Sequence, residues 1–319
     1  MNQLIENLPA KRIMNGGYLR KYGMLSAFAL ICLILSLVTP NFFSLQNVTI
    51  ILRQVSINGI LAIGVTFVII SGGIDLSLGS VVAFTGVVAA LFAHPGEYPL
   101  IAALTAAILA GLAIGGLNGL AVTRGKVAPF IVTLGMMTIA RGLALVASEG
   151  RPVTNLSDSF NYIGGGSLLG VPVPILIFSA IILVSSFLLN KTRIGRYMYA
   201  VGGNEKAAYA SGVPVNTVKV VSYMICSGMA AIAGIVLASR ITTGQPNAGV
   251  AYELDAIAAV VIGGTSLAGG IGSIGGTVLG VLLIGVINNG LDLLNISSYY
   301  QQIIKGVIII AAALIDRKK

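Results

Sequence analysis

The sequence predicts an all-α integral membrane protein, a polytopic bundle of about ten transmembrane helices. Of its 319 residues, 56% are hydrophobic and only 9% are charged, and such a composition cannot provide a normal soluble surface. Apolar runs of about 18 or more residues, enough to cross roughly 30 Å of hydrocarbon, recur along the whole chain. We therefore expect one transmembrane domain over residues 1–319 and no separate soluble domain.

The first half of the chain should contain five of these helices. Residues 1–21 form a basic tail, which is expected in the cytoplasm. The apolar run that follows, residues 22–39, is longer than the core of a signal peptide and has no convincing cleavage site, so it should remain as a membrane helix. Short polar stretches then separate the other four helices, which we expect at 56–71, 76–93, 100–122 and 127–147.

The second half begins with a polar, glycine-rich loop at 148–172, which should lie on the outer side. A helix at 173–190 follows, and residues 191–219 then form a long basic loop. The remaining helices are expected near 218–239, 253–268, 275–291 and 299–315.

Five helices in each half have a topological consequence, because an odd number per half requires any internal repeat to be inverted in the membrane. Ile74-Asp75-Leu76 opens the third helix of the first half, and Leu254-Asp255-Ala256 opens its counterpart in the second. These short matches leave open whether the two five-helix halves form an inverted repeat.

The basic residues set the orientation. In this topology 14 of the 19 Lys and Arg residues lie on one side, and the positive-inside rule identifies that side as the cytoplasm. Both termini and the 191–219 loop of this multi-pass membrane protein are therefore expected there. The pI near 9.7 follows from these loop residues, so no nucleic-acid partner is expected. The 14 residues are Lys11, Arg12, Arg20, Lys21, Arg124, Lys126, Lys191, Arg193, Arg196, Lys206, Lys219, Arg317, Lys318 and Lys319.

A polar island, GGNEKAAYASGVP at 202–214, interrupts the apolar sequence within that loop. Asn204 is a typical N-cap residue, and Glu205 would lie in the positively polarised first turn of a helix. Ala207 and Ala208 favour helix, and Gly212 favours its termination. The pattern predicts about two helical turns at the membrane surface.

The glycines of the chain predict close helix packing. Residues 270–275, GIGSIG, match the spacing of a dinucleotide-binding loop, but both flanks are expected to be membrane helices, so we reject that interpretation. Spacing of the GxxxG type instead favours helices whose backbones approach closely. The pairs are Gly111/Gly115, Gly115/Gly119 and Gly276/Gly280.

Charged and amide side chains inside apolar helices are the main candidates for a translocation pathway. A charge at membrane depth should face the bundle interior, a partner or a water-filled path, and the alternative roles are an interior ion pair or a snorkelled group. For the asparagines we favour hydrogen bonds between helices over substrate contact. The candidates are Asn58, Asp75, Arg141, Asp255, Asn288, Asn289 and Lys305.

No catalytic or metal-binding set is recognisable. His94, the only histidine, lies in an expected outer turn, and the two cysteines fall inside apolar helices, as small buried hydrophobic residues do. The sequence also has no GxxxxGK[ST] loop, so the chain itself should neither bind nor hydrolyse ATP. No cofactor is expected in this chain.

Several stretches resemble the membrane permease subunits of bacterial ABC importers for ribose and related monosaccharides. They include TRIGRYMYAVGGNEKAAYASGV at 192–213, and the likeness covers almost the entire chain. Permeases for other pentoses, galactose and autoinducer-2 share much of this pattern, so the sugar stays open. The other matching stretches are 41–80, 245–270 and 288–301.

The resemblance implies the partners. These are a second permease copy, expected as a homodimer in the lipid membrane, a cytoplasmic ATP-binding-cassette ATPase that holds ATP and Mg, and a periplasmic or surface-anchored sugar-binding protein. It also implies that the helix capped by Asn204 docks on the ATPase as a coupling helix, through Glu205, Ala207, Ala208 and Gly212. Lys206 is an extra residue relative to the family's pattern, and it leaves the individual contacts open.

Three functions therefore compete. The first is a permease, a transport subunit without enzymatic activity, whose bundle rocks as the partner ATPase moves the coupling helix. The second is a proton-coupled secondary transporter that uses Asp75 or Asp255. The third, a membrane scaffold, explains neither the polar breaks nor the coupling-type loop.

Overall fold

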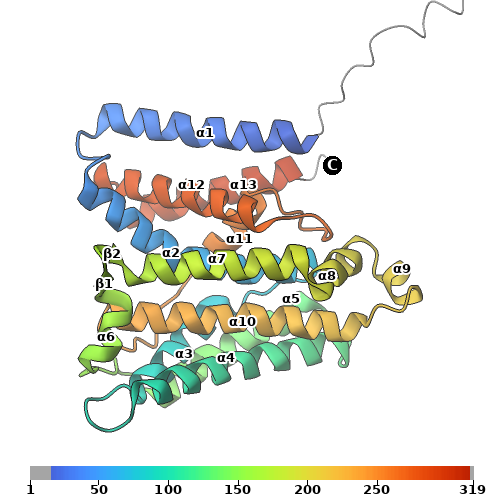
Figure 1. The fold of residues 1–319 in the computed structure, drawn as a ribbon, viewed down its shortest axis with the longest axis horizontal. Coiled ribbons are helices and arrows are strands. Elements are labelled where there is room, and N and C mark those ends of the chain that lie inside the picture. The colour runs from blue at the N-terminus through green and yellow to red at the C-terminus, as the bar shows by residue number, and fades with distance from the viewer. Residues whose placement is uncertain (1–15, 317–319) are drawn as a thin grey trace, which may run out of the picture.

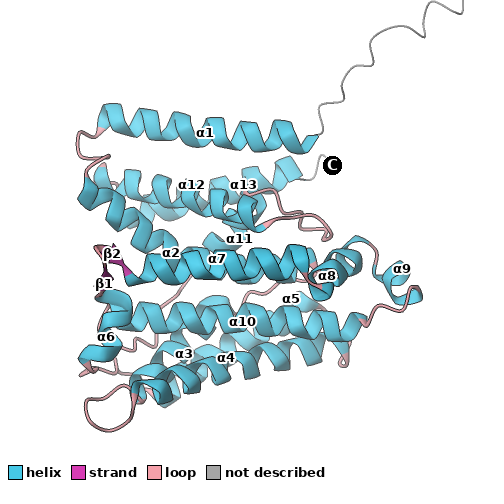
Figure 2. Cartoon of the chain, in the orientation of Figure 1, coloured by secondary structure: helices cyan, strands magenta, loops and turns pink. Residues whose placement is uncertain are grey.

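The computed structural model describes residues 16–316 and is almost entirely helical (Figures 1 and 2). The helices are α1 (Gly16–Val38), α2 (Leu45–Ile70), α3 (Leu78–Leu91), α4 (Leu100–Thr123), α5 (Pro129–Ala147), α6 (Asp158–Gly165), α7 (Val173–Lys191), α8 (Arg193–Gly203), α9 (Glu205–Ala210), α10 (Val215–Arg240), α11 (Tyr252–Ile262), α12 (Ile274–Leu293) and α13 (Ser298–Asp316). Strands β1 (Ser167–Leu168) and β2 (Val171–Pro172) pair in a short antiparallel hairpin.

A helix occupies each of the ten predicted positions, but the helices differ in length. Within residues 16–316, six are long and apolar enough to cross a membrane: α2, α4, α5, α7, α10 and α12. Helix α3 has 14 residues and α11 has 11, so at 1.5 Å per residue they span only about 21 and 16 Å. The fold is thus an all-helical membrane bundle in which the expected ten helices are present, but only six of those described are long and apolar enough for a full crossing.

Helices α2 and α10, each of 26 residues, form the centre of the bundle and pack against each other. Helix α10 also packs on α3 and α4, whereas α2 also packs on α11 and α12. At the periphery, α5 lies against α3, α13 against α11, and α1 against α12 (Figure 1).

The predicted glycine-mediated packing is confirmed. A Cβ atom added at Gly111, Gly115 or Gly119 of α4 would overlap α10 backbone atoms, and one at Gly276 or Gly280 of α12 would overlap carbonyl oxygens in or directly after α11. Glycine is needed at these positions because the two backbones touch.

The bundle has two different ends, visible at the right and left of Figure 1. Helices α8 and α9 lie at one, called here the α9 end, and α6 with the β1–β2 hairpin lies at the other, called the hairpin end. Both lie in segments predicted to be loops, at 191–219 and 148–172, and only α9 was expected there as a helix. Helix α1 begins at Gly16 instead of near residue 22. Residues 1–15 of the predicted tail lie outside the described residues, as do residues 317–319.

Candidate functional site

Helix α9 is the short surface helix that the polar island predicts. The Asn204 side chain caps it, with Oδ1 accepting a hydrogen bond from the Ala207 N–H at 3.0 Å. Gly212 has φ +80°, a left-handed conformation that favours glycine and reverses the chain after the helix. Only Ala208 of this helix is buried, so α9 presents nearly all of its surface to a partner or to solvent.

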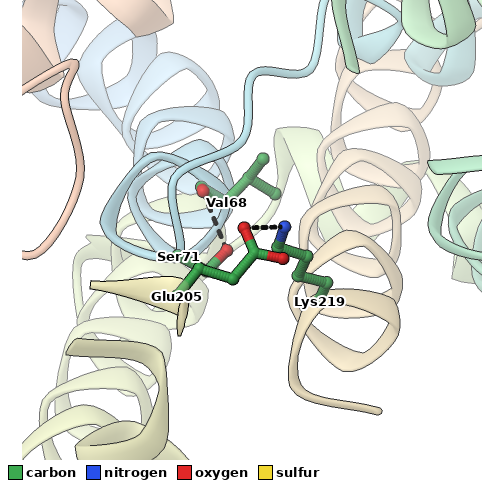
Figure 3. A network of polar contacts seen from close by, with 4 residues as sticks. All are labelled: Val68, Ser71, Glu205 and Lys219. Atoms are coloured by element: carbon green, nitrogen blue, oxygen red, sulfur yellow. Dashed lines mark hydrogen bonds and ion pairs between the residues drawn. The ribbon is translucent and has the colours of Figure 1, made fainter. Parts of the chain in front are cut away.

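An ion pair ties α9 to the bundle. The Lys219 Nζ atom of α10 donates to Glu205 Oε2 at 2.7 Å (Figure 3). The Glu205 side chain is 56% exposed, so this pair adds only about 0.2–1 kcal/mol to stability. Its carboxylate nevertheless stays accessible beside an open groove of about 610 Å³ at the base of α9.

Tyr209 is a surface residue of α9 that the sequence analysis did not single out. Its ring lines the same groove as Glu205 and is 74% exposed. Exposed tyrosine is enriched in protein interfaces because it combines a large apolar ring with a polar hydroxyl. Because Tyr209 lies within the helix predicted at 202–214, the sequence could have identified it as a surface residue of that helix.

Helix α8 joins α9 to the interior of the bundle. A Cβ atom at Gly202 would overlap the Ile70 carbonyl oxygen at the end of α2, and the Gly270 N–H donates to that same oxygen at 2.9 Å. The Tyr199 hydroxyl donates to the Gly272 carbonyl oxygen at 2.8 Å, and burial raises the pKa of this hydroxyl. Thus α8 contacts both α2 and the loop between α11 and α12.

These contacts also account for the dinucleotide-like motif. Among the described residues, no strand precedes residues 270–275; α11 and a turn do. Gly270 has φ +72° and lies against Gly203 of α8. The glycines serve a tight turn and a close backbone approach, as the sequence analysis inferred.

Asp75 is completely buried in the extended break before α3. Its Oδ1 atom accepts hydrogen bonds from the Ser77 N–H at 2.9 Å and the Ser77 hydroxyl at 2.6 Å, and Asn118 of α4 donates to the Ser77 oxygen at 3.1 Å. Tyr223 of α10 donates to the neighbouring Ile74 carbonyl at 3.2 Å. The network fixes the start of α3 between α4 and α10, while the other carboxylate oxygen of Asp75, Oδ2, has no hydrogen-bond partner within the described residues.

Arg141 also makes interior contacts. Its Nη1 atom donates to the carbonyl oxygens of Pro246 at 2.6 Å and Ala248 at 2.8 Å. Those residues belong to the segment between α10 and α11, whose Gly249 reaches Gly79 near the start of α3. Arg141 therefore anchors a connecting segment to α5.

The two adjacent asparagines of α12 behave differently. Asn289 and Asn47 exchange two amide hydrogen bonds, of 3.0 and 2.8 Å, between α12 and α2. This agrees with the helix-to-helix role expected for Asn289. Asn288 is buried, and its Oδ1 atom has no hydrogen-bond partner within the described residues.

Asn58 and Asp255 are brought together. They line one small hollow between α2, α11 and α12, together with Gln54, which was not among the sequence candidates. Asp255 Oδ2 accepts a hydrogen bond from Lys305 Nζ at 2.8 Å, so α13 also reaches this region. Gln54 precedes Asn58 by four residues, which places both amides on the same helical face, and this spacing could have identified it.

The predicted pathway residues thus separate by environment. Asp75, Arg141 and Asn289 hold elements of the bundle together, whereas Asn58 and Asp255 face a hollow. Within the part of the chain that the structure describes, no group of three or more His, Cys, Asp or Glu side chains could hold a metal ion.

Known proteins match this chain over nearly its full length. A family model described as the permease component of branched-chain amino acid transport systems matches residues 47–313. The ribose import permease protein RbsC of Escherichia coli strain K12 is 46% identical over 318 residues, covering 98% of this chain and 99% of the relative. RbsC of Bacillus subtilis strain 168 is 47% identical over 311 residues, covering 97% and 96%.

A further relative is named for another sugar. The L-arabinose transport system permease protein AraH of Escherichia coli strain K12 is 40% identical over 307 residues, covering 94% of this chain and 91% of the relative. No solved structure matches the chain.

Proposed function

Because the chain belongs to the family of branched-chain amino acid transport system permease components, we propose that it is the permease subunit of an ATP-binding-cassette importer for ribose or a related monosaccharide. The observation that carries this proposal is the near full-length identity of 46–47% to the ribose import permeases of Escherichia coli and Bacillus subtilis. The 40% identity to an L-arabinose permease supports the broader sugar class. The chain is a transport subunit of the cytoplasmic membrane.

Helix α9 is the proposed docking element for a separate cytoplasmic ATPase, which binds ATP and Mg, while this chain holds no cofactor of its own. Support comes from its exposure, from the accessible carboxylate of Glu205 and from the groove that Tyr209 lines. Through α8, a displacement of α9 is passed to the end of α2 and to the loop between α11 and α12. This gives nucleotide-driven motion a mechanical route into one membrane domain.

We further propose ten membrane-associated helices arranged as two inverted halves of five. The contacts support this arrangement, since α10 packs on α3 and α4 while its counterpart α2 packs on α11 and α12. The shorter α3 and α11 are also counterparts. Helix α3 follows an extended segment and α11 follows a run of turns at 246–251, and interrupted helices occur in inverted-repeat transporters.

The proposal also covers the orientation of the chain in the membrane and its partners. Both termini and the α9 end lie in the cytoplasm, and the hairpin end faces a periplasmic or surface-anchored sugar-binding protein. A second copy of the chain completes the pathway as a homodimer.

Reconstitution tests the proposal. Vesicles containing this chain, its ATPase and the sugar-binding protein should accumulate ribose only with ATP. Disrupting α9 with Glu205→Ala and Gly212→Val together should abolish uptake, and normal uptake by that variant would refute the docking assignment. Uptake by the chain alone, driven by a pH gradient without ATP, would instead favour the proton-coupled alternative.

A further inference from the structure

The small hollow between α2, α11 and α12 is polar at a depth where the surroundings are apolar. Gln54 and Asn58 of α2 and Asp255 of α11 line it, beside apolar residues such as Val55 and Ile284. A hollow of this kind inside a membrane bundle is a candidate for a water or solute path, because polar groups facing lipid are strongly disfavoured.

The two amides lack partners. Neither the Gln54 nor the Asn58 side chain forms a hydrogen bond within the described residues, although both are half-buried. An amide without a hydrogen bond in an apolar environment is unfavourable, because it has lost water without gaining another partner. Two such groups on one face of one helix indicate that something polar meets them in another state of the protein.

The ion pair beside them has the same implication. The Asp255 and Lys305 side chains are 11% and 30% exposed, and a partly buried ion pair gains little net stability, since both ions lose water. The pair joins α13 to α11 at Asp255, the carboxylate that lines the hollow. When these helices separate, carboxylate and ammonium both become available to hydrogen-bonding groups of a solute.

We propose that this hollow is the closed form of a transient binding site for a polyhydroxylated solute, the sugar that the proposed function transports. Gln54 and Asn58 would donate to and accept from hydroxyl groups, Asp255 would accept from them, and Lys305 would hold Asp255 in the closed state. The inference rests on the proposed function and adds to it the residues that the sugar touches.

The closed geometry requires a movement that the fold can provide. The enclosed space is about 10 Å³, room for about one water and not for a sugar. Gly285 of α12 makes the closure tight, because a Cβ atom there would overlap Val55 of α2. The walls of the hollow belong to α2, α11 and α12, and α8 contacts the end of α2 and the loop that joins the other two. Motion of α9 can therefore separate these helices and open the hollow.

The first test separates solute contact from coupling. In reconstituted vesicles, the double variant Gln54→Leu with Asn58→Leu should lower ribose uptake at least tenfold, while ATP hydrolysis stimulated by the sugar-binding protein stays within twofold of wild type. Thr138→Val is the control, because it removes an exposed hydroxyl of α5 that does not line the hollow. Wild-type uptake by the double variant would overturn the inference, whereas failure of wild-type vesicles to use ATP for uptake would overturn the proposed function instead.

A charge exchange tests Asp255. The variant with Asp255→Lys and Lys305→Asp retains an ion pair, so its thermal unfolding should match wild type more closely than that of Asp255→Ala. Uptake should nevertheless stay at least tenfold low, since the carboxylate has left α11. Recovery of both stability and uptake would reduce the pair to a structural role and refute its contact with the sugar.

Thiol labelling supplies a readout that does not depend on sugar uptake. Cys32 and Cys226 are first changed to Ser, and Asn58→Cys is then exposed to a water-soluble thiol reagent. We expect slow labelling at rest and at least tenfold faster labelling during ATP turnover, because the hollow opens. Equal labelling rates at rest and during ATP turnover would show that the hollow does not open to water.

Discussion

Adding one methyl group at Gly202 should uncouple ATP hydrolysis from transport. This glycine lies where α8 crosses the end of α2, and an alanine Cβ would meet the Ile70 carbonyl oxygen and come within 2.5 Å of the Gly270 nitrogen. Since real Cβ contacts do not fall below 3.0 Å, the two backbones must separate. Their separation also breaks the 2.9 Å hydrogen bond from Gly270 to Ile70.

The magnitude follows from these contacts. Overpacking destabilises by about 1–3 kcal/mol, and loss of one hydrogen bond by about 0.5–1.5 kcal/mol. The higher helix propensity of alanine returns about 1 kcal/mol, which leaves a net loss of about 0.5–3.5 kcal/mol at the junction. If this loss falls on the coupled position of α8, the coupling between ATPase and bundle weakens by roughly 2–300-fold.

The assay compares ribose uptake per ATP hydrolysed in reconstituted vesicles, together with thermal unfolding in detergent. Gly203→Ala is a matched control, since a Cβ atom at Gly203 meets nothing within 4 Å. We expect Gly202→Ala to lower both uptake per ATP and the unfolding temperature, and Gly203→Ala to change neither. Wild-type behaviour of Gly202→Ala would refute the view that α8 transmits motion by rigid contact.

Three other substitutions test separate parts of the structure. Asn204→Ala removes the cap bond to Ala207 and should weaken α9 by about 0.5–2 kcal/mol, which we expect as lower affinity for the ATPase by pull-down; unchanged affinity would mean that capping does not matter for docking. Gly115→Val should prevent a stable fold and lower the yield of folded protein, because the valine meets the α10 backbone. The control Gly116→Val should express normally, since a Cβ atom there has only one neighbouring atom, at 4.0 Å. Equal yields of the two variants would contradict the packing of α4 on α10. Asn289→Ala removes the paired amide bonds to α2 and should destabilise by about 0.6–1.7 kcal/mol, measured by thermal unfolding, and no loss would argue against a structural role.

The sequence predicted the positions of most long helices because each coincides with an apolar run bounded by polar residues. It placed the start of α2 too late, at residue 56, because the polar Arg53 and Gln54 interrupt the apolar pattern of a helix that begins at Leu45. The predicted length of α11 was too great: the helix was expected over 253–268 but ends at Ile262. Gly263 and Gly264 end it within a stretch that is still apolar. The prediction from sequence also missed α8, although Ile194, Met198 and Val201 recur at helical spacing. The segment is short and contains several basic residues, so it was interpreted as part of a loop in spite of that periodicity.

The candidate site was predictable in part. The capping chemistry of Asn204 and the backbone freedom of Gly212 are local properties, so the sequence could predict α9. The meeting of Asn58 with Asp255 depends on how α2 and α11 pack, almost 200 residues apart, and no local pattern contains it. The glycine spacing of α4 predicted a close contact, but only the tertiary structure identifies α10 as its partner.

The brevity of α11 has a consequence for how the protein is made. Its 11 residues include Asp255 in the first turn, and a carboxylate within an apolar membrane helix opposes insertion into the bilayer. The neutralising Lys305 lies 50 residues later, so during synthesis α11 emerges before the cation that compensates it exists. We expect α11 to enter the bilayer only together with α12 and α13, as the last step of biogenesis. A chain that terminates before α13 would then lack Lys305 and leave the Asp255 carboxylate without its cation.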